Sequence, residues 1–96
     1  LVRDSEILYI EVQGRNLIYH TLHGDLTATG TLKQIEAQLK PSGFYRCNYC
    51  YLVNLRHVGF LDGSEVTVGQ YKLQISRNRR KEFLQQLTQF YGRGGR

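Results

Sequence analysis

Residues 7–22 read ILYIEVQ, GRN and LIYHTL in succession, and this stretch decides the fold. Two runs of β-branched and aromatic residues flank Gly14-Arg15-Asn16, a combination typical of a tight turn, so the stretch predicts a β-hairpin. A second turn at 23–25 and a further run at 26–29 extend the hairpin into a meander. The first third of the chain is therefore predicted to be an antiparallel sheet.

A short helix is predicted after the meander. Thr31-Leu32-Lys33-Gln34 matches a capping box, in which the threonine hydroxyl accepts from a free backbone N–H and the glutamine reaches back. Leu32, Ile35 and Leu39 then fall on one helical stripe. Lys40-Pro41-Ser42-Gly43 ends the segment.

Beyond Gly43 the sequence again favours strands. The predicted runs are Phe44 to Cys47, Cys50 to Asn54, His57 to Leu61, Glu65 to Val68 and Tyr71 to Ile75, with turns at Asp62-Gly63 and Gly69-Gln70. The last run alternates outward Lys72 and Gln74 with inward Leu73 and Ile75. The predicted fold class is mainly β.

The chain is predicted to end in an amphipathic helix that follows Ser76, a good N-cap residue. Its buried face has apolar residues at helical spacing: Phe83, Leu84, Leu87, Phe90 and Tyr91. Gly92 ends the helix, and we expect residues 93–96 to form a mobile tail. Ninety-six residues make one domain, which we place at residues 1–92.

The segment Ser76 to Lys81 holds four cations, Arg77, Arg79, Arg80 and Lys81, in the first turn of this helix. Cations are unfavourable at a helix N-terminus, which is already partly positive, and each costs a few tenths to about 1 kcal/mol there. A bound polyanion explains their presence, because free N–H groups at a helix start favour phosphate. Nucleic acid is the leading candidate, and a solvated basic stripe is the alternative.

The positive charge of the chain is localised. The whole chain has a net charge of +5, yet residues 72–96 contain seven basic residues and one acidic residue. Such a patch suits DNA, RNA or an anionic membrane surface. No apolar run is long enough to span a bilayer and no signal peptide is recognisable, so we expect a cytoplasmic protein with no membrane partner.

Cys47 and Cys50 form a single C-x-x-C pair, which is weak support for a zinc site or a redox couple. Residues three apart on a regular strand point to opposite faces, so a disulfide between them needs a bend. We interpret both as structural thiols, with redox sensing as the alternative. No histidine adds a recognised ligand spacing, so no metal or other cofactor is expected; the histidines are His20, His23 and His57.

Catalysis is not expected. The sequence has no nucleophile elbow and no phosphate-binding glycine loop. Its carboxylates are predicted to lie in separate hairpins: Glu11, Asp25, Asp62 and Glu65. We therefore assign no catalytic residue and expect the protein not to be an enzyme.

Three blocks of sequence together have a familiar order and spacing. They are Glu6 to Glu11, Thr31 to Leu39 with Phe44-Tyr45-Arg46, and Tyr51 to Asn54 leading through Val58 to Ser76-Arg77. In this respect the chain resembles the LytTR (LytR/AlgR-type) DNA-binding domain of bacterial response regulators. The resemblance implies an elongated stack of small antiparallel β-sheets with a short helix and a C-terminal helix. It also implies transcription regulation in a two-component system, through loops that contact duplex DNA.

The resemblance implies three DNA-contacting segments. They contain Gln13, Arg15 and Asn16; Arg46, Asn48 and Tyr49; and Arg77, Asn78, Arg79, Arg80 and Lys81. The family often has histidine at the Asn48 position and serine at the Cys50 position, so both departures bear on the second segment. We expect groove contacts from Arg77 and Asn78, because arginine recognises guanine and asparagine recognises adenine through paired hydrogen bonds.

Partners outside this chain are implied in the same way. The family has a receiver domain N-terminal to the position of Leu1, and we expect this chain to be part of such a longer protein. We expect promoter sites that are repeated, and a dimer on DNA. A small β module that binds RNA or an anionic surface through the basic patch and tyrosines is the alternative from another class.

Overall fold

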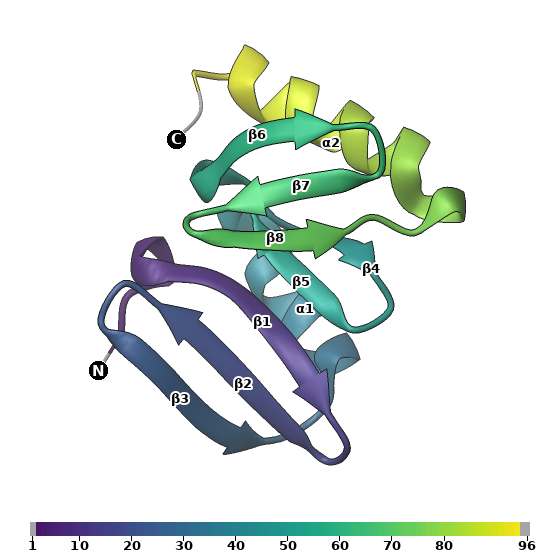
Figure 1. The fold of residues 1–96 in the computed structure, drawn as a ribbon. Coiled ribbons are helices and arrows are strands. Elements are labelled where there is room, and N and C mark those ends of the chain that lie inside the picture. The colour runs from purple at the N-terminus through teal and green to yellow at the C-terminus, as the bar shows by residue number, and fades with distance from the viewer. Residues whose placement is uncertain (1, 95–96) are drawn as a thin grey trace.

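The structure, a computed structural model, describes residues 2–94 and consists mainly of two antiparallel sheets (Figure 1). The five-stranded sheet has the order β3-β2-β1-β5-β4, and the three-stranded sheet has the order β6-β7-β8. The strands are β1 (Ile7–Gln13), β2 (Asn16–Thr21), β3 (Gly24–Thr29), β4 (Phe44–Asn48), β5 (Tyr51–Asn54), β6 (Val58–Asp62), β7 (Glu65–Val68) and β8 (Tyr71–Gln74). The mainly β fold class is confirmed, and the extents of 31 × 26 × 25 Å make the stack only slightly elongated.

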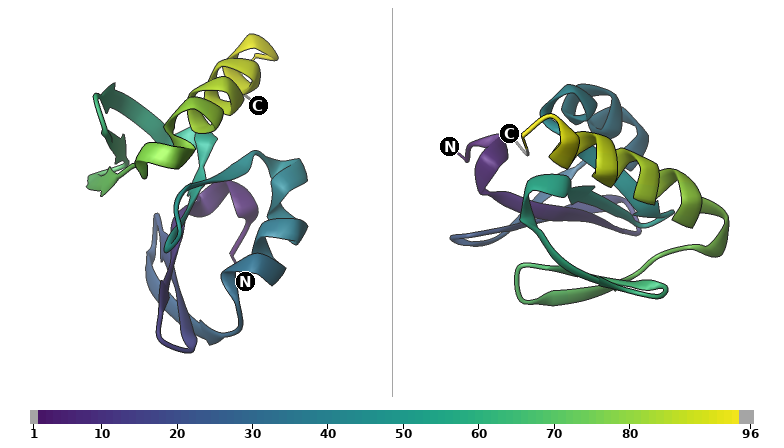
Figure 2. Two further views of the ribbon diagram at one scale, coloured as in Figure 1. Left: turned by 90° about the vertical axis from the view of Figure 1, so that its right-hand side faces the viewer. Right: turned by 90° about the horizontal axis from the view of Figure 1, so that it is seen from above.

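Two α-helices accompany the sheets, α1 (Leu32–Leu39) and α2 (Arg80–Gly92). Helix α1 lies against one face of the five-stranded sheet, and α2 lies beside the three-stranded sheet (Figure 2). Short 3-10 turns are η1 (Asp4–Glu6), η2 (Lys40–Ser42), η3 (Leu55–His57) and η4 (Arg77–Arg79). No described helix is both long enough and apolar enough to cross a membrane.

The first helix begins at the predicted cap, with one of the two bonds of the predicted capping box. Thr31 Oγ1 accepts a hydrogen bond from the Gln34 backbone N–H at 3.2 Å. Leu32 and Leu39 are buried under the sheet. The apolar stripe thus packs one side of the helix onto the hairpin that precedes it.

Two apolar clusters form the core. One lies between the five-stranded sheet and α1, with Ile7, Ile10, Leu17, Leu32, Leu39, Phe44 and Leu52. The other joins both sheets and α2, and includes Leu8, Tyr9, Cys47, Val53, Leu55, Val66, Val68, Leu73, Ile75, Phe83 and Phe90. Strand β1 contributes to both clusters, because its side chains face both sides of the sheet, although the irregular register between Ile7 and Tyr9 places Leu8 and Tyr9 in the same cluster.

The predicted strand at His57 to Leu61 starts one residue later than expected. Asn54 is buried, and its Oδ1 accepts from the Arg56 backbone N–H at 3.1 Å, while its Nδ2 donates to the Ile7 carbonyl at 2.9 Å. These bonds favour a 3-10 turn, so His57 lies in η3 and not in β6. The side-chain amide of Asn54 therefore ties the linker between the sheets to the first strand.

The start of the C-terminal helix also differs from the prediction. Ser76 has an extended backbone, as an N-cap residue does, but its side chain makes no capping hydrogen bond. Residues Arg77–Arg79 form a 3-10 turn, and the α-helix begins at Arg80. Tyr91 is 48% exposed and not part of the buried face, although its hydroxyl donates to the Leu55 and Val58 carbonyls at 3.3 and 3.2 Å.

The expected tail at 93–96 is described only in part. Arg93 follows the helix, and its N–H donates to the Gln89 carbonyl at 3.1 Å. Gly95 and Arg96 lie outside the described residues, so the expectation for them stays a prediction.

Gly43 connects η2 to β4 at a point of close packing. Its φ of +87° is in the left-handed region, and a Cβ atom there would lie 2.7 Å from Phe90 Cε1. Alanine at this position would therefore meet both backbone strain and a steric clash. Glycine is required here for the docking of α2 against β4.

We predict that Gly43→Ala lowers the free energy of unfolding by about 2 kcal/mol or more, the sum of left-handed strain and overpacking. Gly63→Ala is the matched control, because its φ is +61° but no atom lies within 4 Å of the added Cβ. The control should lose about 1 kcal/mol through strain alone. Urea unfolding of both variants measures the difference, and equal losses would contradict the packing argument.

Candidate nucleic-acid interface

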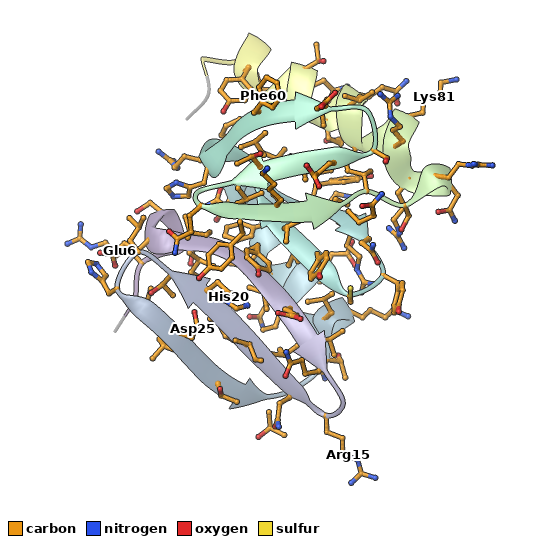
Figure 3. All side chains as sticks on the ribbon, viewed as in Figure 1. Glu6, Arg15, His20, Asp25, Phe60 and Lys81 are labelled. Carbon is orange, nitrogen blue, oxygen red and sulfur yellow. The ribbon has the colours of Figure 1, made fainter. Side chains whose placement is uncertain are left out.

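The three predicted DNA-contacting segments lie along one edge of the molecule, although they come from different parts of the fold. The turn between β1 and β2, the turn between β4 and β5, and η4 with the first residues of α2 all lie at the right-hand side of Figure 1. We call this the loop edge. Figure 3 shows that the Arg15 and Lys81 side chains point outward at its two ends.

The β1–β2 turn presents polar side chains that the core does not use. Gln13, Arg15 and Asn16 are all exposed, and Gly14 has the positive φ of +60° that a tight turn requires. Gln13 Nε2 donates to Glu11 Oε2 at 3.3 Å, which orients the glutamine along the strand. Arg15 extends from the tip of the turn with its guanidinium in solvent.

The β4–β5 turn is held by the side chains of its own predicted contact residues. Arg46 Nε donates to Glu36 Oε1 of α1 at 3.1 Å, and Arg46 Nη1 donates to the Tyr49 carbonyl at 3.2 Å. The Arg46 side chain is only 15% exposed in this ion pair. Tyr49 is 75% exposed at the tip of the turn. The structure thus places Tyr49 in solvent and gives Arg46 a positioning role.

Asn48 joins this turn to the second sheet. Its Nδ2 donates to the Gln74 carbonyl at the end of β8 at 3.1 Å, and its Oδ1 accepts from the Cys50 backbone N–H at 3.4 Å. The Ser76 backbone N–H also donates to the Cys47 carbonyl at 2.8 Å. These bonds fix the β4–β5 turn against the start of η4, so the second and third segments hold a constant relative position.

The cations after β8 divide into two groups. Arg77, Arg80 and Lys81 share an open groove of about 790 Å³ on the outer side of α2, together with Leu84, Gln85, Thr88 and Gln89. Arg79 is half-buried and lies toward Tyr45 and Cys47 instead. On a helix, residues 77, 80 and 81 share a side while residue 79 points elsewhere, and the structure has the same separation.

The groove is electrostatically suited to an anion. Its lining contains three cations and no acidic residue. Arg80 Nε donates to the Gly63 carbonyl at 2.8 Å, a bond that leaves the positive charge uncompensated. Like charges held together at a positive helix end repel one another, and duplex phosphates would relieve that repulsion.

A buried histidine cluster was missed by sequence reasoning. His20 Nε2 lies 3.0 Å from Glu11 Oε1, and His20 Nδ1 lies 2.9 Å from Asp25 Oδ1. The expectation that Glu11 and Asp25 lie apart was wrong, because β1, β2 and β3 are adjacent and in register. The His20 ring also stacks on Tyr9, with centroids 4.2 Å apart. The described residues hold no group of three that could bind a metal, and we interpret this cluster as structural.

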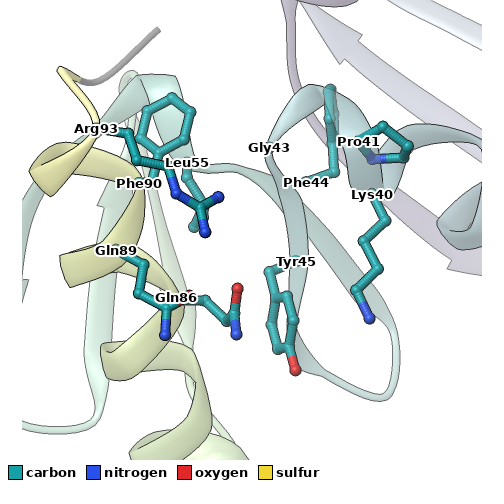
Figure 4. Close-up of a pocket in the computed structure, with 10 residues that line it drawn as sticks. All are labelled: Lys40, Pro41, Gly43, Phe44, Tyr45, Leu55, Gln86, Gln89, Phe90 and Arg93. Carbon is teal, nitrogen blue, oxygen red and sulfur yellow. The ribbon is translucent and has the colours of Figure 1, made fainter.

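A separate cavity of about 120 Å³ lies between α2 and β4 (Figure 4). Lys40 and Arg93 line it, with Gln86 and Gln89 on the helix side. Phe90 and Gly43 also line it, and the Phe90 ring lies against Gly43. This cavity includes none of the predicted DNA-contacting residues.

Comparisons with known proteins identify the family. The family model described as the LytTr DNA-binding domain matches residues 1–88. No curated protein matches the chain. Among solved structures, the LytTr DNA-binding domain of a response regulator from Bacillus cereus superposes with a TM-score of 0.80. The two are 21% identical, and the match covers 90% of this chain and 84% of the other. The chain therefore belongs to the LytTR family of DNA-binding domains.

Proposed function

We propose that this LytTR DNA-binding domain recognises specific sequences of duplex DNA through its loop edge, and so regulates transcription as the output domain of a two-component response regulator. One observation carries the proposal. Two turns of the five-stranded sheet and the segment that leads from β8 into α2 reach the same edge, where cations are concentrated. An elongated polyanion can contact all three at once.

The residues of the loop edge would have different roles in DNA binding, according to their side chains and positions. Arg77 and Asn78 are exposed at the start of η4 and have the donors and acceptors to read base edges. Arg80 and Lys81 lie further along the groove and would contact phosphates. Arg79 would act mainly through its packing beneath the turn. Arg15 and Asn16 would contact a neighbouring groove from the far end of the edge.

The β4–β5 turn would contribute Tyr49 directly and Arg46 indirectly. Arg46 already bonds to Glu36 and to the Tyr49 carbonyl, so its role is to hold the turn in shape. Asn48 retains lone pairs on Oδ1, but its Nδ2 already donates to the Gln74 carbonyl. Its contribution to DNA binding would therefore come largely from the fixed position of the turn.

The wider assembly belongs to the same proposal. We infer a receiver domain in the full protein, repeated promoter sites, and two copies that occupy them. The Bacillus cereus relative is described as part of a methyl-accepting/DNA response regulator, which supports this inference. The proposed location is the cytoplasm, where duplex DNA is accessible, and the proposed role involves no catalysis and no cofactor.

The redox alternative is not favoured by the thiols themselves. Both cysteines are free, and Cys47 is fully buried. Burial, and secondarily the nearby Cys50, raise the pKa of the Cys47 thiol to about 12. Burial also raises the pKa of Cys50. Both groups are protonated thiols at neutral pH, which makes them poor nucleophiles.

Alanine substitutions at the loop edge should have unequal effects. We predict that Arg80→Ala weakens binding to all sequences alike and reduces the salt slope by about 1. Arg77→Ala should instead cost about 1–3 kcal/mol on the preferred sequence and relax discrimination. Arg56→Ala is the matched control, because Arg56 is exposed beside η1, outside the loop edge. Fluorescence anisotropy at several salt concentrations measures these effects. Unchanged affinity in all loop-edge variants would contradict the proposal.

Selection from random duplex DNA should recover a short motif. If two copies bind repeated sites, the motif should recur at a spacing of about one helical turn, 10–10.5 base pairs, or a multiple of it. Sequencing of the selected pool provides the measurement. A pool without a motif, or a stronger preference for single-stranded RNA or anionic vesicles at the same salt, would count against sequence-specific duplex binding.

Thiol chemistry provides a further prediction. In the native protein iodoacetamide should modify Cys50 slowly and Cys47 only after unfolding, because the Cys47 sulfur is fully buried. Mass spectrometry of native and urea-treated samples separates the two sites, with Cys50→Ser as the control. Affinity for DNA should be the same for reduced and mildly oxidised protein. A change in affinity for DNA on oxidation that requires both cysteines would support the redox hypothesis.

A further inference from the structure

Strand β3 is an open sheet edge. All six of its residues, Gly24–Thr29, are exposed, and no other described segment pairs with its outer side. The strand contains no lysine and no proline, and its register with β2 is regular throughout. Natural proteins usually block such an edge by one of these means, so an unblocked one suits pairing with another strand.

The other sheet edges are blocked. The backbone of β4 is occupied by the Ser76 N–H, which donates to the Cys47 carbonyl, and the register of β4 shifts between Arg46 and Asn48. Strand β6 also has an irregular register, between Val58 and Phe60. Strand β8 is only four residues long and carries Lys72. The contrast makes β3 the edge that remains available among the described strands.

The register shows which backbone groups of β3 are free. The hairpin loop between β2 and β3 is two residues long, because Thr21 pairs with Gly24. Hydrogen-bonded pairs alternate with non-bonded pairs in an antiparallel ladder, so Gly24, Leu26 and Ala28 bond to β2. The N–H and C=O groups of Asp25, Thr27 and Thr29 therefore point away from the sheet.

We propose that β3 pairs with β3 of a second copy of this chain, antiparallel and about a twofold axis at Thr27. In this register Thr27 meets Thr27 of the partner subunit, and Asp25 meets the partner's Thr29. In each pair the free N–H and C=O groups of the two residues face one another. The Asp25–Thr29 pair occurs twice by symmetry, so the three pairs would form roughly six backbone hydrogen bonds. The two sheets would become one continuous sheet.

The side chains of β3 are compatible with this symmetry. The strand carries a single charge, Asp25, which would face threonine and not its own copy, so no like charges oppose each other. Leu26 is 49% exposed and would face the partner's Ala28 on the α1 side. There an apolar hollow of about 280 Å³ is lined by Val2, Ile7, Tyr19, Leu26 and Ala28. Pairing would bring two such hollows together and remove them from water.

The proposed interface meets the loop edge only at one end, where Thr29 pairs with Asn16 of the β1–β2 turn. Strand β3 lies at the lower left of Figure 1, whereas η4 and the β4–β5 turn lie at the right. A twofold axis normal to the sheet turns the two loop edges away from each other. Association through β3 therefore goes beyond the proposed DNA binding and needs no DNA.

Charge substitutions at the twofold axis test the proposal, because residue 27 of one copy lies opposite residue 27 of the other. Thr27→Lys and Thr27→Glu should each weaken self-association about fivefold, as about 1 kcal/mol for a cross-strand pair implies. An equimolar mixture of the Thr27→Lys and Thr27→Glu variants should restore association, as a heterodimer in which opposite charges meet at position 27. Thr29→Lys is the matched control: it adds the same charge to the same strand, but opposite the partner's Asp25, and should retain or strengthen association.

Sedimentation velocity from micromolar to millimolar protein, without DNA, provides the measurement. Concentration-dependent protection of the Asp25, Thr27 and Thr29 amide protons from exchange provides a second one. A wild-type chain that stays monomeric throughout would overturn the proposal, as would a dimer indifferent to both Thr27 variants. Binding of a single DNA site by the Thr27 variants, which lie further from the β1–β2 turn than Thr29 does, should still respond to Arg77→Ala and Arg80→Ala as in the wild-type chain, so a failure of this proposal is distinct from a failure of DNA binding.

Discussion

The junction between the two sheets is the constraint on which the rest of the structure depends. The end of β8 packs on the edge of β4, where the Ser76 N–H donates to the Cys47 carbonyl at 2.8 Å and Asn48 Nδ2 donates to the Gln74 carbonyl at 3.1 Å. Cys47 must be small and buried for this approach, and its side chain lies in the same cluster as Phe83 of α2. Because the junction is rigid, the turn after β4 and the cations after β8 occupy fixed positions on one edge. A shift of either sheet would separate them.

Local sequence signals predicted most of the elements but not their assembly. The limits of β1 and β7 agree with the prediction, because turn residues and alternation are short-range properties. The insertion of β5 beside β1 was not predictable in this way, since strands about 40 residues apart are brought together only by the shared core. His57 was misassigned for a related reason. The side chain of Asn54 forms a turn there while it also binds the Ile7 carbonyl, a long-range partner.

The candidate site likewise has some features that local sequence predicts and others that depend on tertiary packing. Helical spacing alone separated Arg79 from Arg77, Arg80 and Lys81, and the groove on α2 has this arrangement. Sequence reasoning did not reveal that Arg46 pairs with Glu36 or that Asn48 reaches Gln74, because both partners are brought close by tertiary packing. The contact between His20 and Asp25 could have been predicted from the sequence. A two-residue loop fixes the register of β2 and β3 and places these residues opposite each other.

The β1–β2 turn has a consequence for how the binding preference of such a domain can evolve. Gln13, Gly14, Arg15 and Asn16 are all exposed, and none belongs to either apolar cluster. Substitutions at the three non-glycine positions therefore leave the buried scaffold intact, whereas a change at Asn48 also disturbs the contact between the sheets. Under the proposed DNA contacts, substitutions in the first turn would alter the preferred operator sequence at little cost to folding. The second turn is expected to diverge more slowly among descendants of one ancestral domain.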